Sequence, residues 1–519
     1  MSSTPCTWPR PTGDAGVTWI LAIDLGNGGP KVAAVEPDGA LGHVAHRAVS
    51  VDIGVDGRAT QDADEWWTCL IEAAREVVAA RIADAPMAVA VTGQWGSTVP
   101  VDAEGQPVGP VLLWADTRAR PYMREVIGGP VTVQGFAPHR VLPWVRRTGG
   151  APTPSGADPT GHSLLLQREF PEILARTRWL LEPVDYLGMR LTGRAAATPA
   201  SMILSWLTDN RIGAREGYDE DLVRRARRDP RLLPPLLPTG SVLGPLLPLV
   251  AEALGIPPGI PVTCGIPDLH AAIVGSGAIA PFASHIAVST TAWISSRVPF
   301  KRTDVLHSMA SVPGLDPRFP VVADNQEAGG GALRWLREQV FDDDYATLID
   351  EAASAPAGCE GVLFAPWLNG ERSPVEDKEV RAAFVGLSLR TDRATMIRAA
   401  MEGVALNGRW LFDVYEKFCK RRIDSLRILG GGAQSELWCS MFAGAFDRRI
   451  EQVAQPRDAQ MRGAALFALV SLGELSLAEA AARVSVATVF EPGDCDREAY
   501  ADAYAEYRGL YKRLKGLRR

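Results

Sequence analysis

Two strands joined by a glycine-rich turn open the chain, and a similar unit returns in its second half. The apolar run 19–23 ends at Asp24, glycines follow closely, and 31–35 has the character of a return strand. Residues 285–288 and 292–298 repeat this arrangement around a polar turn. The repetition predicts two related halves rather than one continuous core.

The elements that follow the first unit indicate an α/β fold. Residues 41–49 read as a third strand, the segment 61–64 (Gln-Asp-Ala-Asp) supplies a helix N-cap, and 87–91 read as a further strand. Between the cap and that strand, apolar residues recur at helical spacing: Trp67, Leu70, Ile71, Ala74, Val77 and Val78. A meander followed by a helix and a strand is typical of an α/β domain.

The length of the chain predicts at least two domains. Its 519 residues exceed what one hydrophobic core holds, and 46% hydrophobic with 22% charged residues is ordinary for a globular protein. We place the domain boundary near 277–282 and interpret the Gly- and Pro-rich segment 148–161 as a surface loop. The predicted units are a loose tail (1–16), a first domain (17–280), a second domain (281–475) and a helical extension (476–519), whose segment 496–517 packs one face on the second domain.

Charge and cysteine usage exclude several classes of function. A net charge of −7 without a block of like charge gives no electrostatic footprint for nucleic acid. The seven cysteines lack the spacing of a zinc site, and we expect reduced thiols in the cytoplasm. Prolines interrupt the first residues, so we expect no secretory signal, and no apolar stretch is long enough for a membrane span.

The run 366–374, Pro-Trp-Leu-Asn-Gly-Glu-Arg-Ser-Pro, is suited to a fixed loop. Its glycine and prolines disfavour a helix or strand, although apolar segments flank it. Together with Arg381 and the Phe-Val-Gly-Leu at 384–387, it resembles the signature of the FGGY carbohydrate kinases. The alternative is a structural elbow that braces a domain interface.

The resemblance extends from about residue 19 to residue 472. It implies two actin-like (ribonuclease H-like) ATPase domains of α/β class that face a central cleft, with the sugar on the first domain and the nucleotide on the second. The implied reaction moves the γ-phosphate of ATP, with Mg²⁺ as cofactor, to a hydroxyl of a small ketose or alditol. The resemblance allows a homodimer and implies no nucleic-acid or membrane partner.

The first glycine turn is a candidate phosphate site. Backbone N–H groups of Gly26, Asn27 and Gly28 can converge on phosphate oxygens, Asp24 can hold Mg²⁺ through water, and Lys31 can neutralise charge. The family usually carries Thr or Ser where this chain has Asn27 and Gly28, so an amide must substitute or the grip on ATP weakens. The alternative is an ordinary glycine-rich hairpin.

Asp268 lies after an apolar strand and before a helix of small residues, at a strand end where ligands approach α/β sheets. By the resemblance, Asp268 is the general base that orients the sugar hydroxyl and accepts its proton, and it joins Asp24 as a carboxylate for Mg²⁺. From the local residues alone, an N-cap aspartate is an equally good interpretation.

Three consecutive glycines, at 430–432, connect a strand to a helix start. Backbone without Cβ atoms can approach an adenine or seat a phosphate. By the resemblance, Gly431, Gly432, Ala433 and Ser435 form the adenosine site, together with the small residues 463–465 of a later helix. The alternative is a plain turn, which would rarely need three glycines.

Further ATP-binding elements match the family more loosely. They are the turn with Thr290 and Thr291, and the glycine segment around Gly330. Ser289 stands where the family prefers glycine.

Gln94, Trp95 and Asp116 have the properties of sugar ligands. Amides and carboxylates pair with hydroxyls, and an aromatic face covers C–H groups. The alternatives are a core tryptophan for Trp95 and an ion pair of Asp116 with Arg118. Xylulokinases usually carry Met-His after Gly-Gln, whereas this chain has Trp95-Gly96, which argues against D-xylulose as the substrate.

Two functions remain open on the sequence. Asp24, Asp268 and the triple glycine favour an active sugar or polyol kinase. Asn27 and Ser289 favour a nucleotide- or sugar-binding relative that has lost catalysis, although backbone N–H groups carry most phosphate contacts in such turns.

Overall fold

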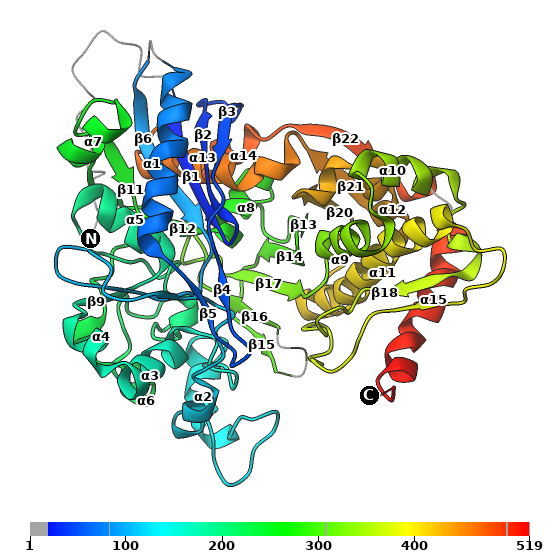
Figure 1. Ribbon diagram of the computed structural model, residues 1–519, viewed down its shortest axis with the longest axis horizontal. Coiled ribbons are helices and arrows are strands. Elements are labelled where there is room, and N and C mark those ends of the chain that lie inside the picture. Colours follow the sequence, from blue (N-terminus) through cyan, green and yellow to red (C-terminus); the bar gives the residue numbers. More distant parts are fainter. Residues whose placement is uncertain (1–18, 82–83, 306, 308, 495–496, 518–519) are drawn as a thin grey trace.

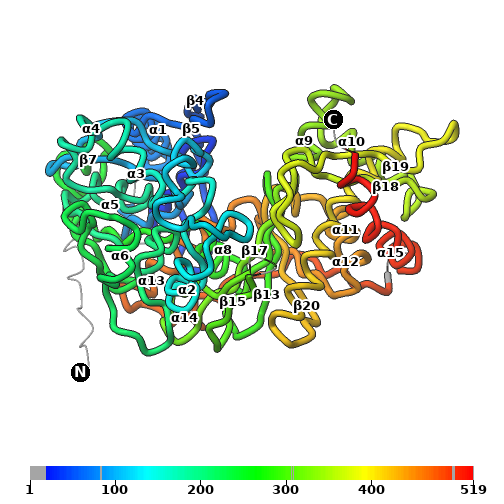
Figure 2. Tube along the Cα trace, turned by 90° about the horizontal axis from the view of Figure 1, so that it is seen from below, coloured from blue at the N-terminus to red at the C-terminus, as the bar shows by residue number. Residues whose placement is uncertain are grey.

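The computed structural model describes residues 19–81, 84–305, 307, 309–494 and 497–517, and the predicted tail at 1–16 lies outside them. Two lobes lie side by side, each built on one large mixed sheet (Figures 1 and 2). None of the described helices combines the length and apolarity needed to cross a membrane.

The sheet of the N-terminal lobe has the order β10-β11-β6-β1-β2-β3, and β12 also pairs with β6. β1 pairs antiparallel with β2 and parallel with β6, so the predicted meander and the following strand are confirmed. The bounds are β1 (Trp19–Gly26), β2 (Gly29–Val35), β3 (Leu41–His46), β6 (Pro86–Gly93), β10 (Val242–Pro245), β11 (Pro261–Thr263) and β12 (Ile266–Pro267). Short strands flank it: β4 (Asp52–Ile53), β5 (Ala59–Gln61), β7 (Val99–Val101), β8 (Val111–Leu112) and β9 (Trp179–Leu181).

The sheet of the C-terminal lobe repeats this plan. Its order is β15-β16-β17-β14-β13-β20-β21-β22. β13 pairs antiparallel with β14 and parallel with β20, as β1 pairs with β2 and β6. The bounds are β13 (Ser284–Val288), β14 (Ala292–Arg297), β15 (Thr303–Asp304), β16 (Met309–Val312), β17 (Val321–Gln326), β20 (Ser425–Leu429), β21 (Arg449–Val453) and β22 (Val486–Phe490). The internal repeat is confirmed, and the fold is the predicted pair of actin-like ATPase domains.

The segment predicted as a helical extension, 476–519, is only partly helical. It contains α14 (Leu477–Ala482) and α15 (Arg497–Leu514), but also β22, which pairs with β21 at the edge of the sheet. Tyr500, Tyr507 and Leu510 of α15 are buried in the core of the C-terminal lobe, so the predicted one-sided packing of the last helix is confirmed.

Helices cover both faces of the N-terminal sheet because alternate residues of a strand face opposite sides. Leu21 and Ile23 of β1 pack in the same core as α1 (Ala63–Ala79), α5 (Pro183–Thr192) and α7 (Pro248–Leu254). Ile20 and Ala22 pack with α8 (Asp268–Ser276) and α13 (Ala459–Ser471). The cap of α1 is Asp62, inside the predicted cap segment 61–64, although the buried stripe of the helix includes Trp66 rather than Trp67.

The C-terminal lobe is layered in the same way. Ile286 and Val288 share a core with the long α11 and with α12 and α15, whereas Ala287 faces α13. The remaining helices and strands of this lobe are α9 (Gly330–Leu336), α10 (Tyr345–Ser354), β18 (Leu363–Ala365), β19 (Ala383–Val385), α11 (Arg393–Cys419) and α12 (Glu436–Phe446).

Helices α8 and α13 cross at very close range where the lobes meet. A Cβ atom at Gly463 would lie 1.8 Å from the carbonyl oxygen of Ala271, and one at Gly275 would lie 1.8 Å from that of Ala459. Glycine is therefore needed at both positions. This crossing gives a packing reason for the glycine at 463, which the sequence assigned to the adenosine site.

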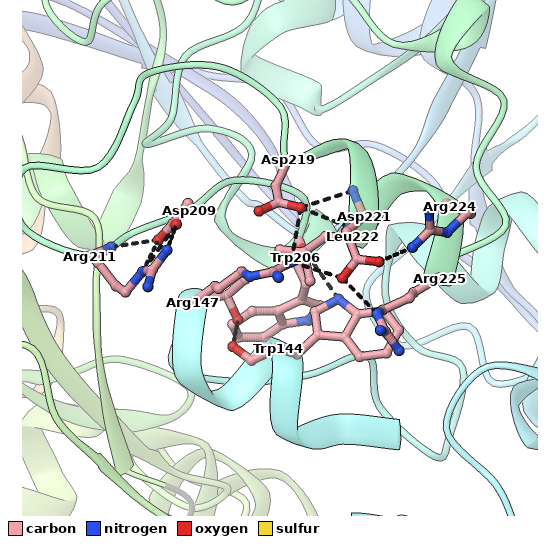
Figure 3. Close-up of polar contacts among 11 residues, drawn as sticks. Trp144, Arg147, Trp206, Asp209, Arg211, Asp219, Asp221, Leu222, Arg224 and Arg225 are labelled. Atoms are coloured by element: carbon pink, nitrogen blue, oxygen red, sulfur yellow. Dashed lines mark hydrogen bonds and ion pairs between the residues drawn. The ribbon is translucent and has the colours of Figure 1, made fainter. Parts of the chain in front are cut away.

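An insertion in the N-terminal lobe carries α2 (Pro138–Arg147), α3 (Pro159–Glu169), α4 (Pro171–Arg176) and α6 (Glu220–Arg225). Arg147 bridges the carboxylates of Asp219 and Asp221 at 3.0 Å each, and the indole of Trp144 donates to the carbonyl oxygen of Trp206 at 3.1 Å (Figure 3). These contacts fix the segment after Ala200, which reaches the candidate site.

The loop predicted at 148–161 is confirmed over 148–158, but it is not exposed as predicted. Residues 148–158 are all described, and none of them is exposed. The carbonyl oxygen of Gly149 accepts a hydrogen bond of 3.0 Å from Thr303 Oγ1 of the C-terminal lobe, and residues 159–161 belong to α3. The loop therefore lies against the other lobe, which its Gly and Pro content could not reveal.

Candidate active site

Asp24 and Asp268 lie at neighbouring strand ends. Asp24 of β1 and Ile266 of β12 are both paired with Thr92 of β6, and Asp268 begins α8 two residues later. Burial raises the pKa of Asp268 to about 7, and the nearby charge of Asp24 adds to the shift. Burial also raises the pKa of Asp24, while Lys31, its partner across β1 and β2, opposes that shift. The sequence predicted both carboxylates at this edge.

Asp268 is not the cap of its helix. The N-cap position of α8 is Pro267, and Asp268 Oδ1 accepts a hydrogen bond of 2.7 Å from the N–H group of the next residue, Leu269. The N-cap interpretation is therefore wrong. Asp458, before α13, is a third carboxylate whose charge raises the pKa of Asp24. The sequence did not indicate it, because nothing local connects residue 458 to the end of β1.

The turn between β1 and β2 brings Gly26, Asn27 and Gly28 together beside Asp24. Gly29 shapes this turn, since its φ is +114° and a Cβ atom there would lie 2.0 Å from the carbonyl oxygen of Arg47. A Cβ atom at Gly28 would meet no atom within 4 Å. The turn thus leaves open space at the position where the family carries a hydroxyl.

Asn27 has hydrogen-bond partners that the sequence did not predict. Its side-chain Oδ1 accepts from the indole of Trp114 at 3.1 Å, and its backbone oxygen accepts from Gln61 Nε2 at 2.9 Å. Gln61 Oε1 also lies 3.4 Å from Nε2 of Gln94, the predicted sugar ligand. Gln94 Oε1 is buried without a partner among the described residues, as expected of an amide that awaits a ligand.

The run 366–374 reaches the N-terminal lobe. The guanidinium of Arg372 lies 5.2 Å from the centre of the Trp114 ring and pairs with Glu327. Glu371 is buried and accepts from Asn407 Nδ2 at 2.6 Å and from the N–H group of Glu327 at 2.7 Å, and burial raises its pKa to about 7. In the predicted fixed loop, Glu371 thus contacts the C-terminal lobe, whereas Arg372 reaches Trp114 of the N-terminal lobe.

Trp95 lies half-buried where the lobes meet, in an apolar cluster with Ile203, Leu204 and Leu269. The next residue, Gly96, has φ +77°, and a Cβ atom there would lie 2.6 Å from Leu204 Cδ1. Its N–H group donates to Glu182 Oε2 at 2.8 Å. Trp95 therefore partly fits the alternative interpretation, a core tryptophan. It also packs against Leu269, the residue that follows Asp268.

Asp116 is satisfied inside its own lobe. Its side chain is fully buried, and it accepts from Arg118 Nη2 at 2.6 Å and from the N–H group of Ala59 at 3.1 Å. This geometry is the ion pair of the alternative interpretation.

The turn with Thr290 and Thr291 lies against the glycine segment around Gly330. The N–H group of Gly330 donates to the carbonyl oxygen of Ser289 at 2.6 Å, and that of Gly331 donates to Thr290 at 3.0 Å. A Cβ atom at Gly330 would lie 2.8 Å from the oxygen of Ser289. The glycines therefore let the start of α9 pack on the turn, and their N–H groups serve that contact.

The residues of the triple-glycine segment differ in their surroundings. A Cβ atom at Gly431 would meet nothing within 4 Å, whereas one at Gly432 would lie 2.6 Å from Val288 Cγ1. Ala433 is buried, and its carbonyl oxygen accepts from Gln452 Nε2 at 2.6 Å. Ser435 caps α12 by accepting from the N–H group of Trp438 at 3.2 Å. Only Gly431 thus leaves room for a base or phosphate.

Comparisons with known proteins agree with this architecture. The sequence profiles of the FGGY family of carbohydrate kinases match residues 19–145 (N-terminal domain) and 289–472 (C-terminal domain). The xylulose kinase of Staphylococcus epidermidis is 26% identical, with 96% of this chain and 97% of that protein covered, and the gluconokinase of Bacillus subtilis is 23% identical, with 88% of each covered. The crystal structure of ligand-bound xylulose kinase from Lactobacillus acidophilus superposes with a TM-score of 0.84 at 20% identity, with 96% of this chain and 99% of that chain covered. The chain belongs to the FGGY family of carbohydrate kinases and is a phosphotransferase whose acceptor is an alcohol group.

Proposed function

We propose that this protein transfers the γ-phosphate of ATP to a hydroxyl of a small ketose or alditol, with Asp268 as the general base. The observation that carries the proposal is the pair of carboxylates, Asp24 and Asp268, at adjacent strand ends. A base works best when its pKa lies near the working pH, and that of Asp268 is about 7.

In this mechanism Asp268 orients the sugar hydroxyl and takes its proton as the oxygen bonds to phosphorus. The N–H group of Leu269 holds one carboxylate oxygen of Asp268, which leaves the other to face the hydroxyl. Phosphoryl transfer needs little more than this alignment and stabilisation of charge. Gln94 and Trp95 flank the acceptor, the first with an amide and the second with an apolar face.

The nucleotide would lie between the lobes. The turn at Gly26 to Gly28 and the turn at Thr290 and Thr291 offer backbone groups to its phosphates, and the open position at Gly431 offers room for the adenosine.

The carboxylates fit Mg²⁺ by their chemistry. They supply the hard oxygen ligands that this ion prefers. Burial raises the pKa of Asp268 and the charge of Asp24 adds to the shift, and a dication would relieve this repulsion. Asp24 and Asp268 would hold the ion, which when bound neutralises charge on the phosphates. Among the described residues no group of three or more His, Cys, Asp or Glu side chains could hold a metal, so water and phosphate oxygens would complete its shell.

An alternative is a relative that binds its ligands without turnover. The geometry favours the active enzyme, because the absence of a hydroxyl at Asn27 and Gly28 is accompanied by an amide held in place by Trp114. A turn that had lost its role in phosphate binding would not need its amide held in place.

A coupled ADP-release screen tests the proposal. The panel contains pentuloses, hexuloses, tetritols, pentitols, glycerol and gluconate, and ADP release should depend on one class among them. Asp268→Asn should lower kcat by about 10²-fold or more, the contribution expected of a general base, with ATP affinity kept. Asp62→Asn is the matched control, because it makes the same change at an exposed helix cap where Asn serves equally well. Full activity of Asp268→Asn would overturn the assignment of the base.

A further inference from the structure

We propose that Trp114 is a positioning residue that turns the amide of Asn27 toward the terminal phosphate of a nucleoside triphosphate, and that Arg372 of the other lobe completes this grip. The inference rests on the proposed function and goes beyond it, because it assigns roles to three residues outside the Asp24 and Asp268 pair.

The indole fixes which way the amide points. An indole N–H group can only donate, so the Asn27 atom that lies 3.1 Å from Trp114 Nε1 is the carbonyl oxygen. The NH₂ group of Asn27 is then on the opposite edge of the planar amide, with two donors. The backbone oxygen of Asn27 is held separately by Gln61 Nε2 at 2.9 Å, so the residue is anchored at two points.

The surroundings of the amide leave room for an anion. Asn27 is exposed, and the Cβ position of Gly28 is open to 4 Å. Asn27 is also only three residues beyond Asp24, at the strand edge where Asp268 would meet the acceptor hydroxyl. The phosphate bound at this point would therefore be the terminal one, which is transferred to the acceptor hydroxyl.

A cation from the C-terminal lobe lies over the same indole. The guanidinium of Arg372 is 5.2 Å from the centre of the Trp114 ring. Arg372 and Lys378 share one carboxylate, that of Glu327, and the buried Glu371 accepts from the N–H group of Arg372. The amide of one lobe and the cation of the other therefore face the same anion when the lobes meet.

This arrangement explains how the turn works without a hydroxyl. A threonine hydroxyl rotates freely and can donate to phosphate unaided, whereas an amide can present either its oxygen or its NH₂ group. The oxygen would repel a phosphate. Trp114 removes that choice, so the indole and Asn27 act as one unit.

The first test separates the terminal phosphate from the rest of the nucleotide. Calorimetry in magnesium buffer compares ADP with the non-hydrolysable β,γ-imido analogue of ATP. Trp114→Phe keeps the ring under Arg372 but removes the donor. It should weaken the analogue by about five- to tenfold, the effect of one hydrogen bond between neutral groups, and leave ADP unchanged. Trp67→Phe is the matched control, since Trp67 also lies under an arginine, Arg190, at 4.6 Å, but on α1.

The second test is rescue. Asn27→Thr added to Trp114→Phe should restore the analogue's affinity to within about twofold of wild type, because a hydroxyl needs no indole to orient it. Arg372→Gln should weaken the analogue and spare ADP, and Lys378 remains to pair with Glu327. Equal loss of ADP and analogue in Trp114→Phe, no loss of either, or failure of the rescue would each overturn the proposal. These readouts need no turnover, so they stand apart from the ADP-release screen, whose failure would count against the proposed function instead.

Discussion

At the scale of single residues, Trp95 and Gly96 distinguish the sugar side of this chain from that expected of a xylulokinase. Gly96 has φ +77° and lies against Leu204, so a histidine could not take its place without displacing that side chain. The imidazole donor of the Met-His pair is therefore absent at Gly96, and Trp95 adds an apolar face. Substrate choice should follow this difference.

We expect D-xylulose to have a kcat/KM at least about tenfold below that of the best substrate in the panel, because an unmet hydroxyl in a dry site costs about 1–3 kcal/mol. Side-by-side kinetics measure the ratio. Trp95→Ala should raise the KM of the best sugar and leave the KM of ATP unchanged. D-xylulose as the best substrate would refute the interpretation of Trp95 and Gly96, but not the kinase activity.

Asp324 should make stability depend on pH. It is buried under Ser373, whose hydroxyl donates at 2.6 Å, and burial raises its pKa to about 8. A pKa raised above the unfolded value means that the folded state binds the proton more tightly, so the stability it contributes is lost as pH rises through about 8. Asp324→Asn should therefore melt about 3–6 °C above wild type at pH 8.5, with a smaller gain at pH 5.5.

Thermal unfolding across that pH range checks the Asp324 prediction. Asp392→Asn is the control, since Asp392 is an exposed cap of α11 whose pKa is lowered by its bond to Thr395. Its effect should not change between pH 5.5 and 8.5. A constant difference between Asp324→Asn and wild type would show that Asp324 does not titrate in this range.

Single residues also show which features of the site the sequence does not predict. The carboxylates Asp24 and Asp268 were predictable because each ends an apolar strand, which is a local pattern. The ion pair of Asp116 with Arg118 was only one of two interpretations of the sequence, since burial is a property of the folded chain. The roles of Trp114 and Asp458 depend on partners far away in the sequence and had no local signal.

At the scale of elements, the structure of the triple-glycine segment supports a more specific prediction than its sequence alone. A Cβ atom at Gly432 would lie 2.6 Å from Val288 Cγ1 and 3.1 Å from the Trp438 ring, whereas one at Gly431 would meet open space. Neither glycine is at positive φ. The two residues should therefore respond differently to the same substitution.

Gly431→Val should fold normally and raise the KM of ATP about tenfold or more, with the KM of sugar little changed, because the side chain occupies the space left for the nucleotide. Gly432→Val should instead lower the melting temperature through its clash with the core. Kinetics and thermal unfolding of both variants decide. If calorimetry found unchanged nucleotide binding in folded Gly431→Val, the segment would be only a turn.

Glycine-rich segments were easier to locate than to interpret. The sequence placed the segments at 289–291, 329–331 and 430–432 on the nucleotide side, and the structure does bring the first two together. The reason for Gly330 is nevertheless the packing of α9 on the turn, and the reason for Gly463 is the crossing with α8. A glycine demanded by a neighbouring backbone looks the same in sequence as one demanded by a ligand.

For the whole molecule, the repeat predicted two related domains correctly, because strand patterns recur within each half. How the halves meet was not predictable, since it depends on α8 from one half, α13 from the other and the loop 148–158 against Thr303. Apolar residues from both sheets and both helices form one core there, so the crossing of α8 and α13 should fix the relation between the lobes.

We expect Gly463→Ala to loosen that relation. Its Cβ atom would lie 1.8 Å from the backbone oxygen of Ala271, which cannot move aside as a side chain can. Alanine gains about 1 kcal/mol of helix propensity over glycine, so a fall in melting temperature of about 5 °C or more would mean that the clash outweighs this gain. Gly408→Ala in α11 is the control, because its Cβ atom would meet side-chain rings and no backbone, that of Phe446 at 3.2 Å and that of Phe442 at 3.4 Å. Since α13 packs with strands of both sheets, the KM values of sugar and ATP should rise together in Gly463→Ala. Unchanged melting and unchanged kinetics would show that the crossing relaxes freely and that the lobes are held by other contacts.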